Sequence, residues 1–82
     1  MRLSELKKAM PEAVFYNFSD VRITGISFDS RRVSEGDLFF ALVGAKMDGH
    51  KYIIDAVSKK CSAIVVNKKI DAGFSMPQIV VE

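Results

Sequence analysis

The sequence predicts a small single α/β domain with a mixed, mostly parallel sheet of about four strands flanked by helices. Its 82 residues are too few to give two domains a core each. Hydrophobic residues make up 49% of the chain, enough apolar material to oppose the conformational entropy of folding. The apolar patterns follow the order helix, strand, strand, helix, strand, strand, so that the central helix can form a right-handed crossover between parallel strands.

A short amphipathic helix is predicted at the beginning of the chain. Leu3, Leu6 and Met10 recur at helical spacing, Ser4 is a candidate cap and Pro11 a stop signal. The role expected for this helix is packing against the sheet.

Two strands follow a loop that extends through Pro11 and Asn17. Residues 21–28 (VRITGISF) alternate in polarity and are rich in β-branched side chains, which favours a strand closed by Phe28. Residues 29–37 are rich in turn formers, and residues 38–43 (LFFALV) form a continuous apolar run typical of a strand covered on both faces. We expect these two strands to form the centre of the sheet.

The second half of the chain predicts a helix and two more strands. After a glycine-rich loop at 44–50, with Asp48 as a candidate cap, one buried helix face is expected from Tyr52, Ile53, Ala56 and Val57. Lys59 and Lys60 fall in the predicted last turn, where positive charge complements the helix dipole. Residues 63–66 and 78–81 are expected to be strands, with a loop over 71–76 between them.

Composition excludes several classes of protein. The formal charge is +2 and the basic residues are dispersed, which argues against a nucleic-acid partner. Cys61 is the only cysteine, so no internal disulfide can form, as suits a reducing cytosol. The N-terminal residues lack the continuous apolar stretch of a signal peptide, and no window is long enough to span a membrane. We therefore expect a cytoplasmic protein without a membrane partner.

Two polar loops, at 29–32 and 44–50, each follow a predicted strand, at the strand ends where ligands gather in open α/β sheets. Ser30 could offer its hydroxyl and amide to a phosphate or ribose, and Arg31 could add charge. Alternatively, Asp29 and Ser30 only satisfy a turn. The sequence leaves both readings open.

Catalytic and metal-binding patterns are not evident. Residues 44–51 have the glycine spacing of a phosphate-binding loop, but His50 and Lys51 replace its essential lysine and hydroxyl residue. His50 is the only histidine, which argues against zinc, and the scattered Asp29, Asp37 and Asp48 are expected to cap turns rather than bind magnesium. Because Cys61 has no evident activating base, the residues indicate a binding module.

The motifs in combination resemble a known family. Residues 23–50 (ITGISFDSRRVSEGDLFFALVGAKMDGH), with Tyr52-Ile53 and Ala56 ahead of residues 63–66, are similar to the N-terminal domain of Mur ligases. Within that family the pattern looks most like the ligases that add the third peptide residue, the UDP-N-acetylmuramoyl-tripeptide synthetases. The similarity covers about residues 21–66, and D-S-R, G-D-L-F-F-A-L and D-G-H are specific only together.

The resemblance implies that residues 1–82 bind the UDP moiety of UDP-N-acetylmuramoyl-L-Ala-D-Glu. The implied contacts come from Phe28, Ser30, Ala45, Lys46 and Met47, with support from Asp29, Arg31, Gly44, Asp48, Gly49 and His50. Some family members carry His-Gln where this chain has Ala45-Lys46, so backbone contacts are expected from this pair. Lys46 is a candidate phosphate contact.

The resemblance further implies an ATP-dependent amide ligase of peptidoglycan precursor synthesis whose central ATP-binding and C-terminal domains lie outside this chain. ATP and Mg²⁺ are expected to bind only in the full-length enzyme, and its ATP loop is expected downstream of Glu82. The 82-residue chain alone is expected to be inactive. Its expected partners are the UDP-N-acetylmuramoyl peptide and the rest of the same polypeptide. Two alternatives stay open: the ligase that adds D-Ala-D-Ala, and a non-catalytic stand-alone interaction module.

Overall fold

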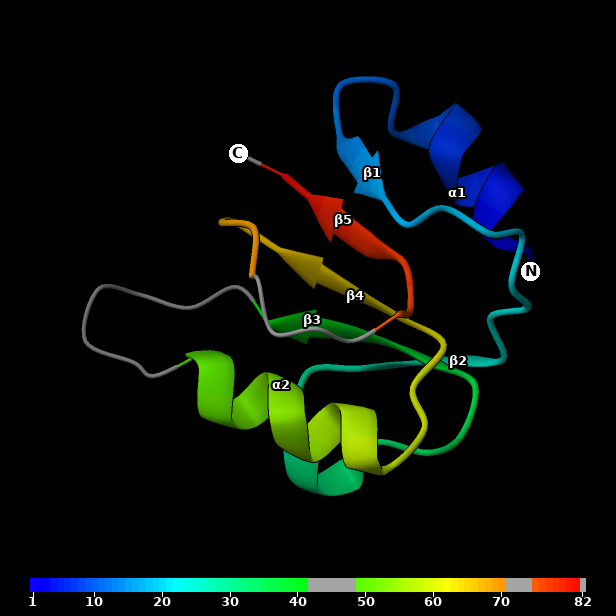
Figure 1. Cartoon of the computed structure of the whole chain (residues 1–82). Coiled ribbons are helices and arrows are strands. Elements are labelled where there is room, and N and C mark those ends of the chain that lie inside the picture. The colour runs from blue at the N-terminus through cyan, green and yellow to red at the C-terminus, as the bar shows by residue number, and fades with distance from the viewer. Residues whose placement is uncertain (42–48, 71–74, 82) are drawn as a thin grey trace.

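The chain folds into a five-stranded sheet with a helix on each face (Figure 1). The computed structural model describes residues 1–41, 49–70 and 75–81. Its elements in chain order are α1 (Leu3–Ala9), β1 (Val14–Tyr16), β2 (Gly25–Ser27), the 3-10 helix η1 (Ser30–Arg32), β3 (Asp37–Ala41), α2 (Gly49–Ser58), β4 (Ala63–Val66) and β5 (Gln78–Val80).

The strand order in the sheet is β1-β5-β4-β3-β2. Neighbouring strands from β2 to β5 are parallel, and β1 pairs with β5 in the antiparallel direction. Since α2 lies between β3 and β4 in the chain, it forms the predicted crossover between two adjacent parallel strands. The predicted small α/β domain with a mostly parallel sheet is confirmed.

Two apolar layers hold the sheet between the helices. Side chains of alternate residues in β3 and β4 point to opposite faces: Phe39 and Ile64 pack with Ile53 of α2, whereas Leu38 packs with Leu3 of α1. All four residues of β4 are buried. The continuous apolar sequences of β3 and β4 therefore reflect coverage on both faces, as predicted.

The number and positions of the strands correct the expectation from the sequence. The structure has an additional strand, β1, within the segment expected to be a loop. The strand partner of its three residues is β5, at the other end of the chain, so no local sequence pattern predicts this strand. The predicted central position of the first strand is wrong, because β2 lies at the edge of the sheet, next to β3.

The strand predicted over 21–28 is also shorter than expected. Only Gly25–Ser27 form β2, because Arg22 makes an isolated bridge to Arg2 and the N–H of Ile23 donates to the carbonyl of Met1 at 2.6 Å. Val21 and Ile23 thus pair with the N-terminal residues, while the N–H of Thr24 donates to the Gly36 carbonyl in the turn before β3.

The cap of α1 comes from a distant residue rather than from Ser4. Ser4 lies inside the helix and its N–H donates to the Asp20 carboxylate at 2.9 Å, while Arg2 occupies the N-cap position. This bond lowers the pKa of Asp20, together with the nearby charge of Arg2. A carboxylate from another loop thus satisfies a free amide of the first turn.

Helix α2 begins before Tyr52, at Gly49. Ile53 and Ala56 are buried as predicted, but Tyr52 is 40% exposed. Successive helix residues point about 100° apart, so Tyr52 points away from the direction in which Ile53 is buried. The helix ends at Ser58, so Lys59 and Lys60 lie in the following turn rather than in the last helical turn. The candidate cap Asp48 lies outside the described residues.

Candidate functional site

The candidate site lies at the carboxyl edge of β2 and β3. The two strands run parallel with Ser27 opposite Phe39, so the carboxyl ends of both strands lie side by side at the same end of the sheet. After β2 the chain enters a polar turn, residues 27–32, which we call the β2 turn. The second predicted loop, residues 44–50, follows β3. Its residues 44–48 lie outside the described residues, whereas Gly49 and His50 begin α2 and only their helical backbone is described. How that loop sits relative to the β2 turn therefore stays a prediction.

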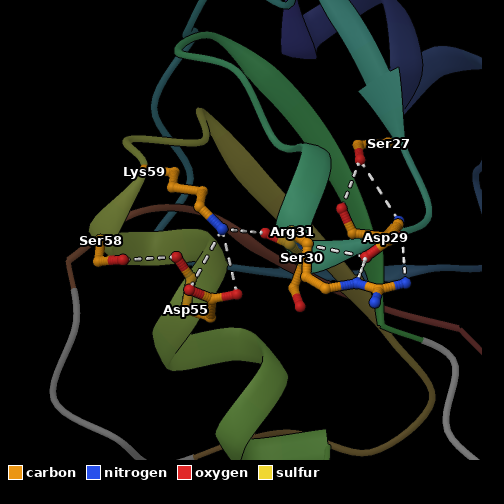
Figure 2. Close-up of polar contacts among 7 residues, drawn as sticks. All are labelled: Ser27, Asp29, Ser30, Arg31, Asp55, Ser58 and Lys59. Carbon is orange, nitrogen blue, oxygen red and sulfur yellow. Dashed lines mark hydrogen bonds and ion pairs between the residues drawn. The ribbon is translucent and has the colours of Figure 1, made fainter.

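Asp29 organises the β2 turn (Figure 2). Its carboxylate accepts a hydrogen bond from the Arg31 backbone N–H at 3.0 Å and caps η1. Its backbone carbonyl accepts from the Ser27 hydroxyl at 3.0 Å and from the Arg32 N–H at 2.9 Å. These local bonds define the turn expected from the sequence.

An ion pair closes the same turn on its solvent side. The Arg31 guanidinium donates to both carboxylate oxygens of Asp29, at 3.1 and 3.0 Å. These bonds lower the pKa of Asp29 to about 2 and raise the pKa of Arg31. Because the Arg31 side chain remains 84% exposed, the pair can open without burying a charge. Arg31 could thus turn toward an anionic ligand at low cost.

Lys59 joins the β2 turn to the end of α2. Its ammonium donates to the Ser30 carbonyl at 2.8 Å and pairs with the Asp55 carboxylate at 3.2 Å (Figure 2). Ser30 itself is only 5% exposed. The sequence did not point to Lys59 or Asp55 as part of the site, because Lys59 and Ser30 are 29 positions apart and no local pattern encodes their contact.

The β2 turn also carries an exposed aromatic ring. Phe28 is 77% exposed and packs on Phe40 of β3, with ring centroids 5.1 Å apart and planes inclined by 30°. Ile26, one alternation earlier on β2, is 57% exposed. The end of β2 therefore presents a largely solvent-exposed aromatic ring beside the polar residues of the turn.

A shallow open hollow lies between η1 and α2. Its volume is about 520 Å³, and it is lined by Ser30, Arg31, Tyr52, Ile54, Asp55 and Ser58. The hollow places the exposed side of Tyr52 beside the Arg31 end of the β2 turn.

The remaining candidates from the sequence do not join this site. Asp37 is the first residue of β3, so it lies at the opposite end of that strand from the candidate site. Its carboxylate accepts a hydrogen bond from the Ser34 N–H at 2.9 Å. Cys61 is buried beside Met76, and burial raises its pKa to about 11. Within residues 1–41, 49–70 and 75–81, no three His, Cys, Asp or Glu side chains form a group that could hold a metal ion.

The same described part of the chain contains no helix with the length and apolar character needed to cross a bilayer. The fold and the polar edge together define a class: a small open α/β domain with its candidate ligand site at the carboxyl ends of parallel strands.

Comparison with known proteins identifies the family. Residues 22–80 match the model of the Mur ligase family, catalytic domain. The chain is 43% identical over 65 residues to the UDP-N-acetylmuramoyl-L-alanyl-D-glutamate–2,6-diaminopimelate ligase of Bacteroides thetaiotaomicron, covering 79% of this chain and 14% of that protein. It is 39% identical over 83 residues to the ligase of the same name from Mesorhizobium japonicum, covering 100% of this chain and 17% of the relative. The chain therefore belongs to the Mur ligase family.

Solved structures agree with this assignment. A crystal structure of MurF from Acinetobacter baumannii superimposes with a TM-score of 0.75 at 30% identity, over 95% of this chain and 17% of that one. MurF from Thermotoga maritima, solved in complex with ADP, gives a TM-score of 0.55 at 31% identity over 76% of this chain and 14% of that one. The chain thus spans about a sixth of the length of these relatives.

Proposed function

We propose that this domain binds the uridine-diphosphate part of a UDP-N-acetylmuramoyl peptide at the carboxyl edge of β2 and β3. The observation that carries the proposal is the exposed ring of Phe28, set directly before the capped turn of Asp29 to Arg32. The relatives are named for ligases of UDP-N-acetylmuramoyl peptides, which contain a pyrimidine and a pyrophosphate. An aromatic ring beside a polar turn offers chemistry for both.

The aromatic ring suits the base. Phe28 already stacks on Phe40, so its position is supported from the sheet while most of its surface stays free. Stacking of a base on an aromatic side chain contributes about 1–3 kcal/mol. Binding uracil on Phe28 would also remove apolar surface from water.

The polar turn suits the sugar and phosphates. Ser30 is the expected contact in the β2 turn, and Asp29 and Arg31 hold the turn in shape. From the second loop we propose backbone contacts from Ala45 to Met47, with Lys46 near a phosphate. Gly44, Asp48, Gly49 and His50 would support that loop.

We propose that the complete polypeptide is an ATP-dependent ligase acting in the cytoplasm in peptidoglycan precursor synthesis. Residues 44–51 lack the lysine and the hydroxyl of a phosphate-binding loop, and within residues 1–41, 49–70 and 75–81 no acidic cluster fits Mg²⁺. ATP and Mg²⁺ belong to the remainder of the enzyme, and this chain alone should not ligate. Binding energy from the nucleotide would help to orient the distant reacting groups.

The added residue is proposed to be the third of the peptide, as in the diaminopimelate ligases. Addition of D-Ala-D-Ala remains a second candidate, because a tripeptide–D-alanyl-D-alanine ligase from Buchnera aphidicola is 42% identical over 64 residues. Assays of the full-length protein with diaminopimelate, lysine and D-Ala-D-Ala in competition distinguish the two.

The binding proposal is tested by titrating the 82-residue chain with UDP and following backbone amides by NMR. We expect shifts concentrated at residues 28–32 and 44–48, and Phe28→Ala should weaken UDP binding about tenfold or more. Phe18→Ala is a matched control, because Phe18 is also an exposed aromatic, 40% accessible, but packs against Phe15 of β1. Equal affinities for the two variants, or unchanged amides at 28–32, would contradict the proposal.

A further inference from the structure

Lys59 makes the contact on which this inference depends. Its ammonium donates to the Ser30 carbonyl at 2.8 Å and lies 3.3 and 3.2 Å from the two carboxylate oxygens of Asp55. An ammonium has three donors, and these three oxygens can engage all of them. Figure 2 shows the lysine extending from the end of α2 to the β2 turn.

The Ser30 carbonyl, to which Lys59 donates, belongs to the peptide that orients the next residue of the β2 turn. The peptide joining Ser30 to Arg31 is planar, so fixing the Ser30 carbonyl also fixes the direction of the Arg31 N–H. That N–H donates to the Asp29 carboxylate at 3.0 Å. Holding one carbonyl therefore stabilises the turn that follows Phe28.

Asp55 in turn holds Lys59. The two residues are one helical turn apart, an arrangement in which an acidic residue before a lysine is favourable. The Asp55 carbonyl accepts from the Ser58 hydroxyl at 2.6 Å, which closes the end of α2. The Lys59 and Asp55 side chains are 35% and 41% exposed, so their ion pair contributes little stability and its main effect is on geometry.

We propose that Lys59, oriented by Asp55, is a positioning residue that fixes the β2 turn against α2 in its nucleotide-binding shape. The inference rests on the proposed function and adds to it a residue outside both predicted loops. Because the ammonium is engaged by Ser30 and Asp55, it acts through the turn and does not contact the phosphates.

The experiment compares Lys59→Met and Lys59→Arg with Lys8→Met in the 82-residue chain. Lys8 is an exposed lysine on α1, so its replacement removes the same charge without touching the β2 turn. Binding of UDP and of uncharged uridine is measured by NMR titration, together with melting temperature and the ¹⁵N order parameters of residues 28–32.

We expect Lys59→Met to weaken both ligands by a similar factor, about tenfold for the loss of one charged hydrogen bond. Its order parameters should fall at residues 28–32, and its melting temperature should fall below that of Lys8→Met, because the bond to the Ser30 carbonyl also stabilises the ligand-free domain. Lys59→Arg, which can still donate to the carbonyl, should recover most of the affinity.

Three results would overturn the inference. A loss for UDP with no loss for uridine would make Lys59 a direct phosphate contact. Affinities of Lys59→Met equal to those of Lys8→Met would show that the tether does not matter. If the unmodified chain binds neither ligand, the proposed function fails and the positioning role with it, an outcome distinguishable from failure of the variant alone.

Discussion

Gly36 lies in the turn before β3, and its replacement by alanine gives a quantitative test of the fold. Gly36 has a φ of 89°, a conformation that residues with a Cβ rarely adopt. Its N–H donates to the Lys60 carbonyl at 3.1 Å, and its carbonyl accepts from the Thr24 N–H at 3.0 Å. The turn therefore connects the beginning of β2 with the end of α2.

Two costs add in Gly36→Ala. The positive φ costs roughly 1–2 kcal/mol for a residue with a Cβ. The added Cβ would also collide with the Thr24 hydroxyl oxygen, while the Thr24 Cβ and Cγ2 lie at an ordinary 3.5 Å. Rotating Thr24 away from the collision gives up its bond to the Glu35 carbonyl and adds about 0.5–1 kcal/mol. Lower entropy of the unfolded chain offsets about 0.5 kcal/mol, so the expected loss is about 2 kcal/mol.

The assay is urea unfolding followed by circular dichroism, performed on Gly36→Ala in the original chain and in a Thr24→Ala background. We expect the loss to fall by about 1 kcal/mol when the colliding hydroxyl is absent, leaving mainly the backbone cost. A loss below about 0.5 kcal/mol in the original chain would refute the strain argument. Equal losses in the two backgrounds would refute the collision.

Three further predictions concern the core, the β2 turn and the cysteine. Ile64→Ala should destabilise the domain by about 2–5 kcal/mol in urea unfolding, because Ile64 is 0% exposed in the central strand; a loss under 1 kcal/mol would contradict its core position. Asp29 has a folded pKa of about 2, below its ordinary value of 3.8, so its stabilising effect is complete above pH 3.8 and is lost as the pH falls toward 2. NMR titration should show Arg31→Met moving the pKa of Asp29 back toward 3.8, and an unchanged pKa would exclude the ion pair as its cause. Cys61, with its pKa raised to about 11 by burial, should react with a thiol reagent at pH 8 much more slowly in the folded chain than in urea; equal rates would show that the thiol is accessible.

The strands and helix with strong local signals were predictable. After Asp37, β3 is a continuous apolar run, as is β4, and both strands have residues packed on the two faces of the sheet. The buried residues of α2, Ile53 and Ala56, were identified by helical spacing. In each case the pattern extends over neighbouring residues, so the preference of the local segment agrees with its final environment.

Weaker or distant signals misled the prediction. β1 has three residues, and its pairing with β5 is the main reason that it is a strand. Ser4 has the chemistry of a cap but lies inside α1, because Asp20 reaches the helix from another loop. Tyr52 belongs to the predicted apolar set but sits at the margin of the buried face of α2.

The candidate site also has a part that the sequence predicted and a part that it did not. The turn at Asp29 to Arg31 was expected from residue types, since its bonds join residues two apart in the sequence. Its tether to Lys59 was not expected, because it depends on packing α2 against the end of β2. The contacts proposed for the loop at 44–48 stay predictions, as does the binding of UDP.

By itself the sequence determined the α/β class and the segments that fill the core, because these depend on composition and on patterns among neighbouring residues, and its motifs indicated the Mur ligase family through their resemblance to known members. Only the tertiary structure decided the strand order, the edge position of β2 and the attachment of the β2 turn to α2. Those features join groups such as Lys59 and Ser30, 29 positions apart, whose meeting depends on the path of the whole chain.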